Sequence, residues 1–153
     1  MAYTANRELA RCERRLVDFD PDSGSEAIVT LNPAASEKLL SISELGGLQS
    51  VVAGLVHTVG TGSVTSFRIF VADNAAGTTN ATNVVSHALG SDPNAVGDYV
   101  FLEASAEQIR SASSTAAYVG VKVTLATSTD EGIVYFERHA KQAYNALTAD
   151  YVS

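Results

Sequence analysis

The chain has 153 residues and a formal net charge of −7 at neutral pH, with 46% hydrophobic and 18% charged residues. This length predicts one globular domain that buries roughly two thirds of its unfolded surface. The negative charge argues against a broad basic face for nucleic acid, and no stretch reaches the roughly 20 apolar residues of a membrane span. Cys12 is the single cysteine, which excludes a disulfide within the chain. We expect synthesis in a reducing cytoplasm.

Residues 1–22 are predicted to form an arm, and residues 23–153 a β-rich body with a C-terminal tail. Leu9, Cys12 and Leu16 recur at spacings of three and four, which predicts a helix over residues 5–17. Residues 1–19 carry four Arg against three acidic residues, whereas the remaining residues carry six Lys or Arg against fourteen Asp or Glu. A cationic arm on an anionic body can dock on a partner, although a solvated helix with internal ion pairs explains the same charges.

The next segment, residues 18–25, predicts a hinge because it holds three Asp together with Pro21 and Gly24. Its carboxylates do not follow the spacing of a calcium-binding loop, so no metal is expected there. Residues 26–31 fit a short strand. Asn32 and Pro33 then predict a helix over residues 32–40, with Asn32 as its cap. Residues 48–59 fit a helical face or a buried strand, and the strand is favoured because Gly54 weakens a helix and valines crowd one.

The middle of the chain has the alternation of strands. Over residues 64–72, Phe67, Ile69 and Val71 are predicted to face one side, and residues 66, 68, 70 and 72 the other. Residues 73–83 form a polar loop, and residues 84–89 a short strand. The apolar residues within 99–103 run continuously, which predicts a strand covered on both faces.

The last predicted elements are a helix and two strands. Ser105 and Gln108 have the spacing of a capping box, which predicts a short helix with Ile109 as its buried anchor. Residues 116–125 and 133–137 are expected to pair as an antiparallel hairpin, whose polar tip places Asp130 and Glu131 in solvent. The core face of the first strand comprises Val119, Val121, Val123 and Leu125. The predicted fold is mainly β, with a short N-terminal helical arm and one or two short helices.

No group of residues has the spacing of a catalytic or cofactor site. His57 lies in an apolar run, so a hydrogen-bonded core or interface residue is expected there rather than a metal ligand. His87 and His139 have no cysteine companions and no H-x-x-x-H spacing, which argues against zinc. The pairs at residues 24–25 and 62–63 do not complete a nucleophile elbow. We therefore expect a protein that is not an enzyme and that holds no cofactor and no metal.

Three stretches together suggest a family. Residues 66–72 (SFRIFVA) precede a loop rich in Thr and Asn, residues 97–103 (GDYVFLE) precede AEQI at residues 106–109, and residues 118–123 (YVGVKV) precede a polar tip. This arrangement resembles small structural proteins of tailed bacteriophages, in particular capsid decoration or cement proteins, over the C-terminal two thirds of the chain. The resemblance implies a β-sandwich or jelly-roll-like body, a homo-oligomer and attachment to the outer face of an HK97-type capsid shell. The family has no catalytic residues.

The function that this resemblance implies is that of a structural virion protein on the capsid exterior. Such a protein stabilises the head by bridging capsomers, and its partners are the major capsid protein and copies of itself in a homodimer or homotrimer, without direct contact to nucleic acid or membrane. The alternatives are a head–tail connector or tail-tube protein, and a small carbohydrate-binding β-module with residues 73–83 as its rim. The residues expected to contact partners lie in the arm and the tail: Arg7, Leu9, Arg11, Arg14, Arg15, Leu16, Phe19, Tyr144, Leu147 and Tyr151.

Overall fold

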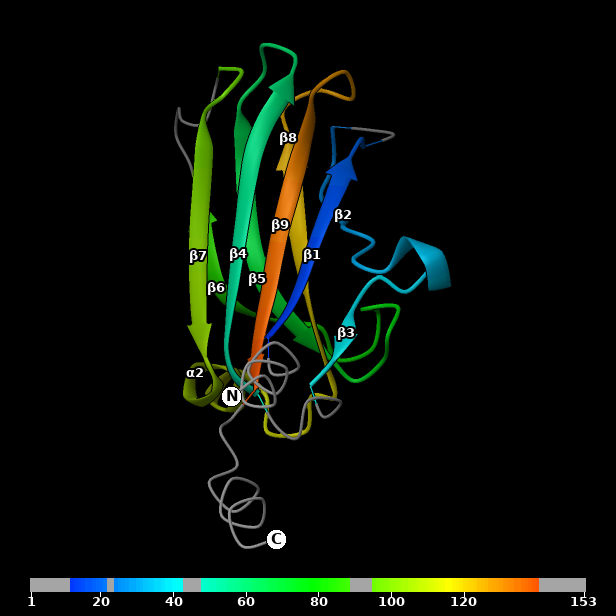
Figure 1. The fold of residues 1–153 in the computed structure, drawn as a ribbon, viewed down its shortest axis with the longest axis vertical. Helices are drawn as coiled ribbons and strands as arrows, with labels where there is room; N and C mark the ends of the chain where they lie inside the picture. Colours follow the sequence, from blue (N-terminus) through cyan, green and yellow to red (C-terminus); the bar gives the residue numbers. More distant parts are fainter. Residues whose placement is uncertain (1–11, 22–23, 43–47, 89–94, 141–153) are drawn as a thin grey trace, which may run out of the picture.

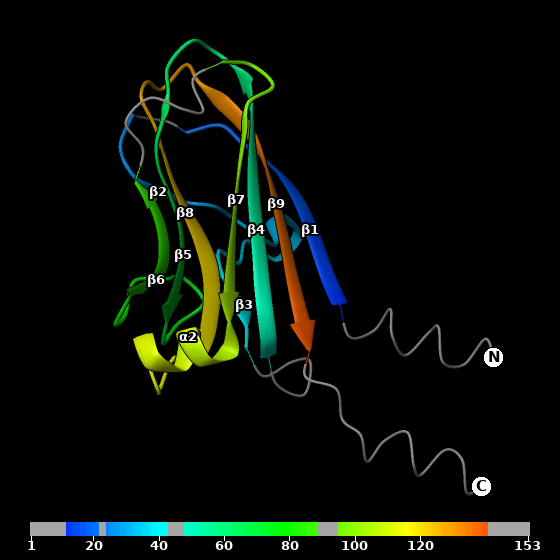
Figure 2. The ribbon, with the colours of Figure 1, turned by 90° about the vertical axis from the view of Figure 1, so that its left-hand side faces the viewer.

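The computed structural model describes residues 12–21, 24–42, 48–88 and 95–140. These residues form two antiparallel β-sheets that pack face to face, as Figures 1 and 2 show from the front and from the side. The prediction of a mainly β protein with a sandwich body is confirmed. Two of its elements are helical, the 3₁₀ turn η1 and the short helix α2.

One sheet has four strands in the order β1-β9-β4-β7, and the other has five, in the order β2-β8-β5-β6 with β3 also on β8. The bounds of the elements are β1 (Cys12–Phe19), β2 (Ala27–Ile28), η1 (Pro33–Ala35), β3 (Leu40–Ser41), β4 (Leu48–Val59), β5 (Val64–Ala72), β6 (Thr82–Ala88), β7 (Tyr99–Ser105), α2 (Ala106–Ala112), β8 (Tyr118–Leu125) and β9 (Glu131–Ala140).

The strand order is that of a jelly roll. β1 pairs with β9, β2 and β3 with β8, β4 with β7, and β5 with β6, and every pair is antiparallel. A chain that makes four such pairs forms a long ribbon, and wrapping the ribbon into two sheets brings β9 beside β4 and β8 beside β5. The strands β1, β7, β2 and β6 stand last in their sheets and form the edges of the sandwich.

The main core lies between the two sheets and follows the alternation of the strands. Phe67, Ile69 and Val71 of β5 are fully buried in it, as the sequence predicts. The predicted core face of β8 is confirmed as well, because Val119, Val121, Val123 and Leu125 are all fully buried. In β4, residues 51, 53, 55 and 57 supply the facing side, so the ambiguous segment 48–59 is the strand that we favoured.

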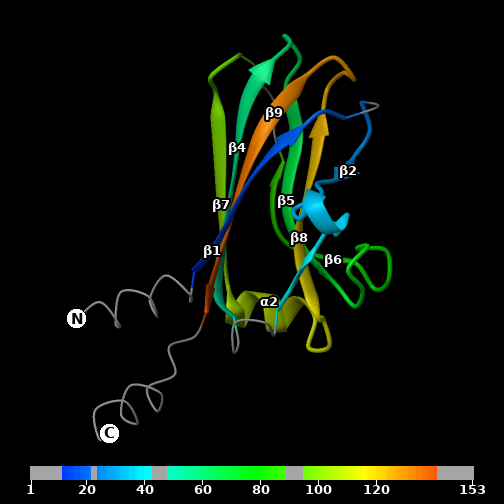
Figure 3. The ribbon, with the colours of Figure 1, turned by 45° about the vertical axis from the view of Figure 1, so that its right-hand side comes forward.

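The outer face of the five-stranded sheet has a cover of its own. Phe70 and Ala72 of β5 pack with Leu39 in a second, smaller cluster of buried residues. Leu39 belongs to the connection between β2 and β3, which runs beside this sheet in Figure 3. The tip of the loop after β5 contributes Gly77, where an added methyl group would meet Leu39, Ile28 and Phe70 at 2.8–3.0 Å. This sheet is thus buried on both faces over part of its area.

The prediction of a helix over residues 5–17 is wrong for its described part. Cys12–Phe19 form β1, which pairs with β9 over eight residues, from Cys12 opposite His139 to Phe19 opposite Gly132. Val17 and Phe19 face the core, so the period of two outweighs the helical spacing of Leu9, Cys12 and Leu16. Residues 1–11 lie outside the described part. The division into an arm (1–22) and a body (23–153) therefore stays a prediction, although residues 12–19 belong to the sheet.

The helix predicted over residues 32–40 is also wrong, because only Pro33–Ala35 form a 3₁₀ turn. The capping prediction fails with it, since the Asn32 side chain caps no backbone group and bonds to Glu37 instead. Two consecutive leucines explain the difference. Leu39 is buried in the small cluster and Leu40 in the main core, and only an extended chain sends neighbouring side chains to opposite sides.

The hairpin predicted from residues 116–125 and 133–137 does not form. β8 pairs with β5, and β9 pairs with β4 and β1, so the two strands belong to different sheets and the turn between them crosses the sandwich. Both strands alternate in the way that a hairpin requires, and alternation does not distinguish pairing side by side from packing face to face. Asp130, expected in solvent at the tip, is fully buried at this crossing.

The predicted capping box is confirmed. Ser105 accepts a hydrogen bond from the backbone of Gln108, the Gln108 side chain accepts one from the backbone of Ser105, and Ile109 is buried. The resulting helix, α2, has seven residues. Within the described residues, no helix is long and apolar enough to cross a bilayer.

Arg138 connects the two sheets near the end of β9. Its side chain faces inward, is 1% exposed and donates a hydrogen bond from Nη1 to the carbonyl oxygen of Ser41 in β3. Burial lowers the pKa of Arg138 to about 10, so the guanidinium stays charged at neutral pH. The Arg138 side chain thus reaches from one sheet to the other near the end of β9.

We expect Arg138→Ala to lower the free energy of unfolding by about 2–5 kcal/mol, because it leaves a cavity and removes the hydrogen bond to the Ser41 carbonyl oxygen. Urea unfolding followed by circular dichroism measures the loss. Arg110→Ala, on the exposed side of α2, is the matched control and should change the stability by less than about 0.5 kcal/mol. Equal losses in the two variants would contradict this role for Arg138.

Candidate interaction surface

The outer face of the four-stranded sheet carries two rows of apolar side chains. The strand registers place Leu16 opposite Tyr135, and Tyr135 and Phe101 on either side of Gly54. The next row runs from Ile133 through Val56 to Tyr99, and the exposed Asp18 of β1 lies opposite Ile133 at its outer end. Residues that lie opposite one another in an antiparallel sheet share a face. We call the six side chains the apolar patch: Leu16, Val56, Tyr99, Phe101, Ile133 and Tyr135.

The apolar patch lies at the surface of the described structure. Leu16 is 71% exposed, Tyr99 66% and Phe101 56%. In Figure 1 this sheet faces the viewer with no described element in front of it. The prediction that residues 99–103 are covered on both faces is therefore wrong. Glu103 could have indicated this. It shares a face of the strand with Tyr99 and Phe101, and a charged side chain on that face predicts that the face is exposed.

Exposed apolar side chains gather on this side of the molecule. The large hydrophobic residues that are exposed within the described chain are Leu16, Val56, Val59, Val96, Tyr99 and Phe101. All six lie on strands of the four-stranded sheet or in the loop that enters β7. Single exposed hydrophobic residues are ordinary, whereas a contiguous group on one face is typical of a surface that binds another molecule.

Phe101 is held flat against the sheet by the glycine beside it. A methyl group at Gly54 would collide with the Phe101 ring, so the ring occupies the space that a side chain at Gly54 would fill. Tyr99 packs edge-on against Phe101, with 5.5 Å between the ring centroids and 62° between the planes. Glycine in a strand interior permits this close approach. The two rings therefore form a low aromatic surface at the border of the sheet.

Charged residues border the apolar patch on the side toward the start of β1 and the end of β9. The Glu137 carboxylate, with its residue only 6% exposed, accepts a hydrogen bond from Arg14 Nε at 2.8 Å and lies 2.7 Å from His139 Nε2. Glu103 of β7 and Glu137 lie on either side of Val52 in the same row, and Glu103 is exposed. An apolar centre with a polar rim is the arrangement found in protein–protein interfaces.

The predicted contact residues divide between surface, core and undescribed chain. Leu16 belongs to the apolar patch, and Arg14 lies on its rim. Arg15 is half-buried, and Phe19 is 7% exposed in the main core, where it stabilises the fold and offers little surface. Whether Arg14 and Leu16 contact a partner stays a prediction. The remaining six lie outside the described residues: Arg7, Leu9, Arg11, Tyr144, Leu147 and Tyr151.

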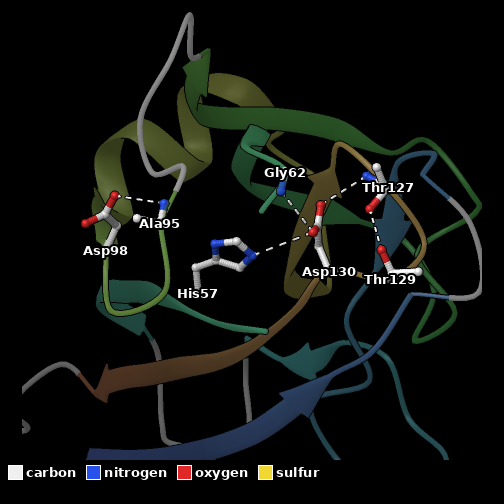
Figure 4. Close-up of polar contacts among 7 residues, drawn as sticks. All are labelled: His57, Gly62, Ala95, Asp98, Thr127, Thr129 and Asp130. Atoms are coloured by element: carbon white, nitrogen blue, oxygen red, sulfur yellow. Dashed lines mark hydrogen bonds and ion pairs between the residues drawn. The ribbon is translucent and has the colours of Figure 1, made fainter. Parts of the chain in front are cut away.

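A buried polar cluster fastens the turns at one end of the sandwich (Figure 4). The Asp130 carboxylate accepts hydrogen bonds from the backbone N–H of Gly62 and of Thr127, each at 3.1 Å. Its Oδ1 lies 4.0 Å from Nε2 of His57, and both side chains are buried. The backbone of His57 donates to Asp98 and accepts from Gly97, at 2.9 and 2.8 Å. Three separate connections thus meet here.

This cluster has a structural role. As predicted, His57 is buried, but neither ring nitrogen has a hydrogen-bond partner among the described residues, so the predicted hydrogen bond is absent there. Burial alone would raise the pKa of Asp130, yet hydrogen bonds from Gly62 and Thr127, together with the nearby His57 imidazole, bring the pKa below its ordinary value of 3.8. Asp130 is therefore a carboxylate that holds turns in place.

One cleft lies at the open side of the sandwich, between the end of β1 and the segment around β2. It has a volume of about 620 Å³ and is lined by Asp18, Asp20, Glu26 and Lys38 among others. The Glu26 carboxylate is already paired with Arg68 and Lys122. Within the described residues, no three acidic, histidine or cysteine side chains are grouped so that they could hold a metal ion.

Comparison with known proteins gives only distant similarities. No family model matches the chain, and no curated protein matches it. Among solved structures, a chain from the endospore appendages of Bacillus, described as disulfide-linked pili, has 13% identity and a TM-score of 0.37, over 85% of this chain and 88% of that one.

Two further structures come from a prophage and a virus. The SPBc2 prophage-derived protein YomS has 6% identity and a TM-score of 0.40, over 83% of this chain and 94% of that one. A chain of infectious bursal disease virus, Gx strain, has 12% identity and a TM-score of 0.42, over 88% of this chain and 34% of that one. Similarities of this size assign no function, so the function is argued below from the surface of the chain.

We expect Asp130→Asn to lower the free energy of unfolding by about 1–3 kcal/mol at neutral pH, because the N–H groups of Gly62 and Thr127 bond to different oxygens of the carboxylate and the amide replaces one of these oxygens with an NH2 group. The folded-state pKa of Asp130 is lowered, so its stabilisation is present above the ordinary value of 3.8 and is lost as the pH falls through the folded-state pKa. The difference between the wild type and the variant should therefore shrink in acid.

Urea unfolding at neutral pH and below about pH 3.5 measures this difference. Glu131→Gln removes a charge from the next residue, which is only half-buried, and is the matched control. A difference between wild type and Asp130→Asn that stays constant with pH would show that the carboxylate does not act through its charge.

Proposed function

We propose that this protein is a structural virion protein, an auxiliary capsid decoration or cement protein that binds the outer face of a phage head shell through the apolar patch. One observation carries the proposal. Within the described chain, the exposed large hydrophobic side chains gather on the four-stranded sheet and in the loop entering β7, while the outer face of the other sheet is partly covered by the chain itself. A binding protein needs such a surface, and a jelly roll supplies it as a flat and rigid one.

The mechanical load on a phage capsid supports the same proposal. A cement protein has to bridge neighbouring capsomers while packaged DNA pushes outward, so its body must resist deformation. Here β4 is bonded to strands on both sides, and the two sheets are tied together by Asp130 at one end and by Arg138 near the other. Many copies on a lattice turn a modest affinity for each site into firm attachment.

The jelly roll itself does not select this function, because capsid proteins, lectins and enzymes share it. The selection rests on the apolar patch and on the resemblance to decoration proteins of residues 66–72, of residues 97–103 with 106–109, and of residues 118–123. The carbohydrate-binding alternative relied on residues 73–83 as an open rim. In the structure, Asn74 bonds to Thr78 and Thr79, and Gly77 is buried against the sheet. The loop is thus anchored at Gly77 and the Asn74 side chain is used within the loop, while residues 76, 78–81 and 83 are exposed. No observation favours the alternative.

The test is attachment of the purified full-length chain to head shells of the phage that encodes it. We expect Leu16→Glu to weaken binding at least about tenfold, because it places a charge in the apolar patch. Co-sedimentation with empty heads, at increasing concentrations of chain, measures the affinity. Leu16 is 71% exposed, so the variant should remain folded.

Ser86→Glu, an exposed change on β6 of the other sheet, is the matched control and should bind as the wild type does. Binding of the wild type to tails and not to heads would favour the tail-tube or connector alternative. Binding to neither particle, or equal binding by Leu16→Glu and wild type, would contradict the proposal.

A further inference from the structure

The strands at the four edges of the sandwich differ in how they are protected against pairing with another chain. Four of the eight residues of β1 are charged, namely Glu13, Arg14, Arg15 and Asp18. The register between β5 and β6 shifts at Val84, so β6 is interrupted. β2 and β3 have two residues each. Charges, bulges and short length are the usual means by which edge strands avoid adding a further strand.

β7 has none of these features except one charge. It runs for seven residues, pairs with β4 without a register shift and contains neither proline nor lysine. Glu103 is its only charged residue. The other side of β7 faces away from β4, and no described strand is paired with it; Figure 2 looks onto this side of the molecule. This edge lies next to the exposed rings of Tyr99 and Phe101 and is paired with no strand among the described residues, so it can accept a strand from outside.

We propose that the partner is a second copy of this chain, whose β7 pairs with β7 antiparallel about a two-fold axis perpendicular to the sheet. An isologous contact of this type needs a surface that is complementary to itself, and an antiparallel strand pair fulfils that condition through the backbone alone. The result is a continuous sheet of eight strands made from two four-stranded sheets.

The side chains select the register of this pair. A two-fold axis at Phe101 places Phe101 opposite its symmetry mate and Tyr99 opposite the mate of Glu103, where the phenol can donate to the carboxylate. An axis at Leu102 would place Phe101 opposite a carboxylate, and an axis at Glu103 would oppose two like charges. Aromatic pairs opposite one another stabilise a sheet, whereas like charges destabilise it. An axis at Val100 would oppose Tyr99 to the mate of Phe101 but would pair only residues 99–101 of the two strands, whereas an axis at Phe101 pairs residues 99–103. The axis therefore lies at Phe101.

The dimer would enlarge the surface described above. Because the axis is perpendicular to the sheet, the outer faces of both sheets point the same way, and the two apolar patches meet at the Phe101 pair. The united patch then extends from Leu16 of one copy to Leu16 of the other. The dimer does not depend on attachment to a shell, so it is tested on the purified chain alone.

The experiment exchanges charges at the axis. Sedimentation equilibrium of the full-length wild type should give a dimer. Phe101→Lys and Phe101→Glu should each weaken the dimer at least about tenfold, because each places two like charges opposite one another. An equal mixture of the two variants should recover the dimer, because the charges then attract. Asn83→Lys on the edge strand β6 is the matched control and should leave the dimer unchanged.

A cross-link provides an independent measurement if a charged variant fails to fold. Phe101→Cys in a Cys12→Ser background should form a disulfide-linked dimer on mild oxidation, whereas Asn83→Cys in the same background should not. A wild type that sediments as a monomer or a trimer would overturn the proposal. So would a dimer that survives Phe101→Lys, or folded charged variants whose mixture stays monomeric.

Discussion

Each β-sheet has two faces, and the described part of this chain covers only three of the four faces in its sandwich. The two inner faces cover each other. The outer face of the five-stranded sheet receives Leu39 and the loop that contains Gly77. Nothing in the described chain lies over the outer face of the four-stranded sheet, although that face carries the apolar patch. This unequal cover leaves the apolar patch exposed on one side of the molecule and covers part of the opposite side.

The positions of the side chains in the apolar patch are fixed by the sheet that carries them. The ladders of β4 with β7 and β9 align the rows of the apolar patch, and Gly54 lets the ring of Phe101 lie flat. Two buried polar side chains secure the frame. Asp130 joins the turns at one end by accepting from backbone N–H groups, and Arg138 reaches from β9 to β3 near the other. Buried charges need such partners, so each also fixes one arrangement of the chain.

Several features could be predicted because they depend on neighbouring residues. The alternation of Phe67, Ile69 and Val71 assigned the core face of β5, and the spacing of Ser105 and Gln108 located α2. The arrangement of strands could not be predicted in this way. β8 and β9 look like a hairpin because both alternate, yet they lie in different sheets. Leu16 and Cys12 have helical spacing, yet β1 gains eight backbone pairings by lying beside β9.

The candidate site follows the same division. From the sequence alone came a mainly β body, a core with correctly assigned faces and a chain without the spacing of a catalytic centre. Only the tertiary structure decided that Phe19 is buried while Leu16 is exposed, that Tyr99 and Phe101 lie on an open face, and that β7 is an edge. The reason is physical. Local backbone geometry decides which side chains of a strand lie on the same face. Whether that face is covered depends on residues far away in the chain.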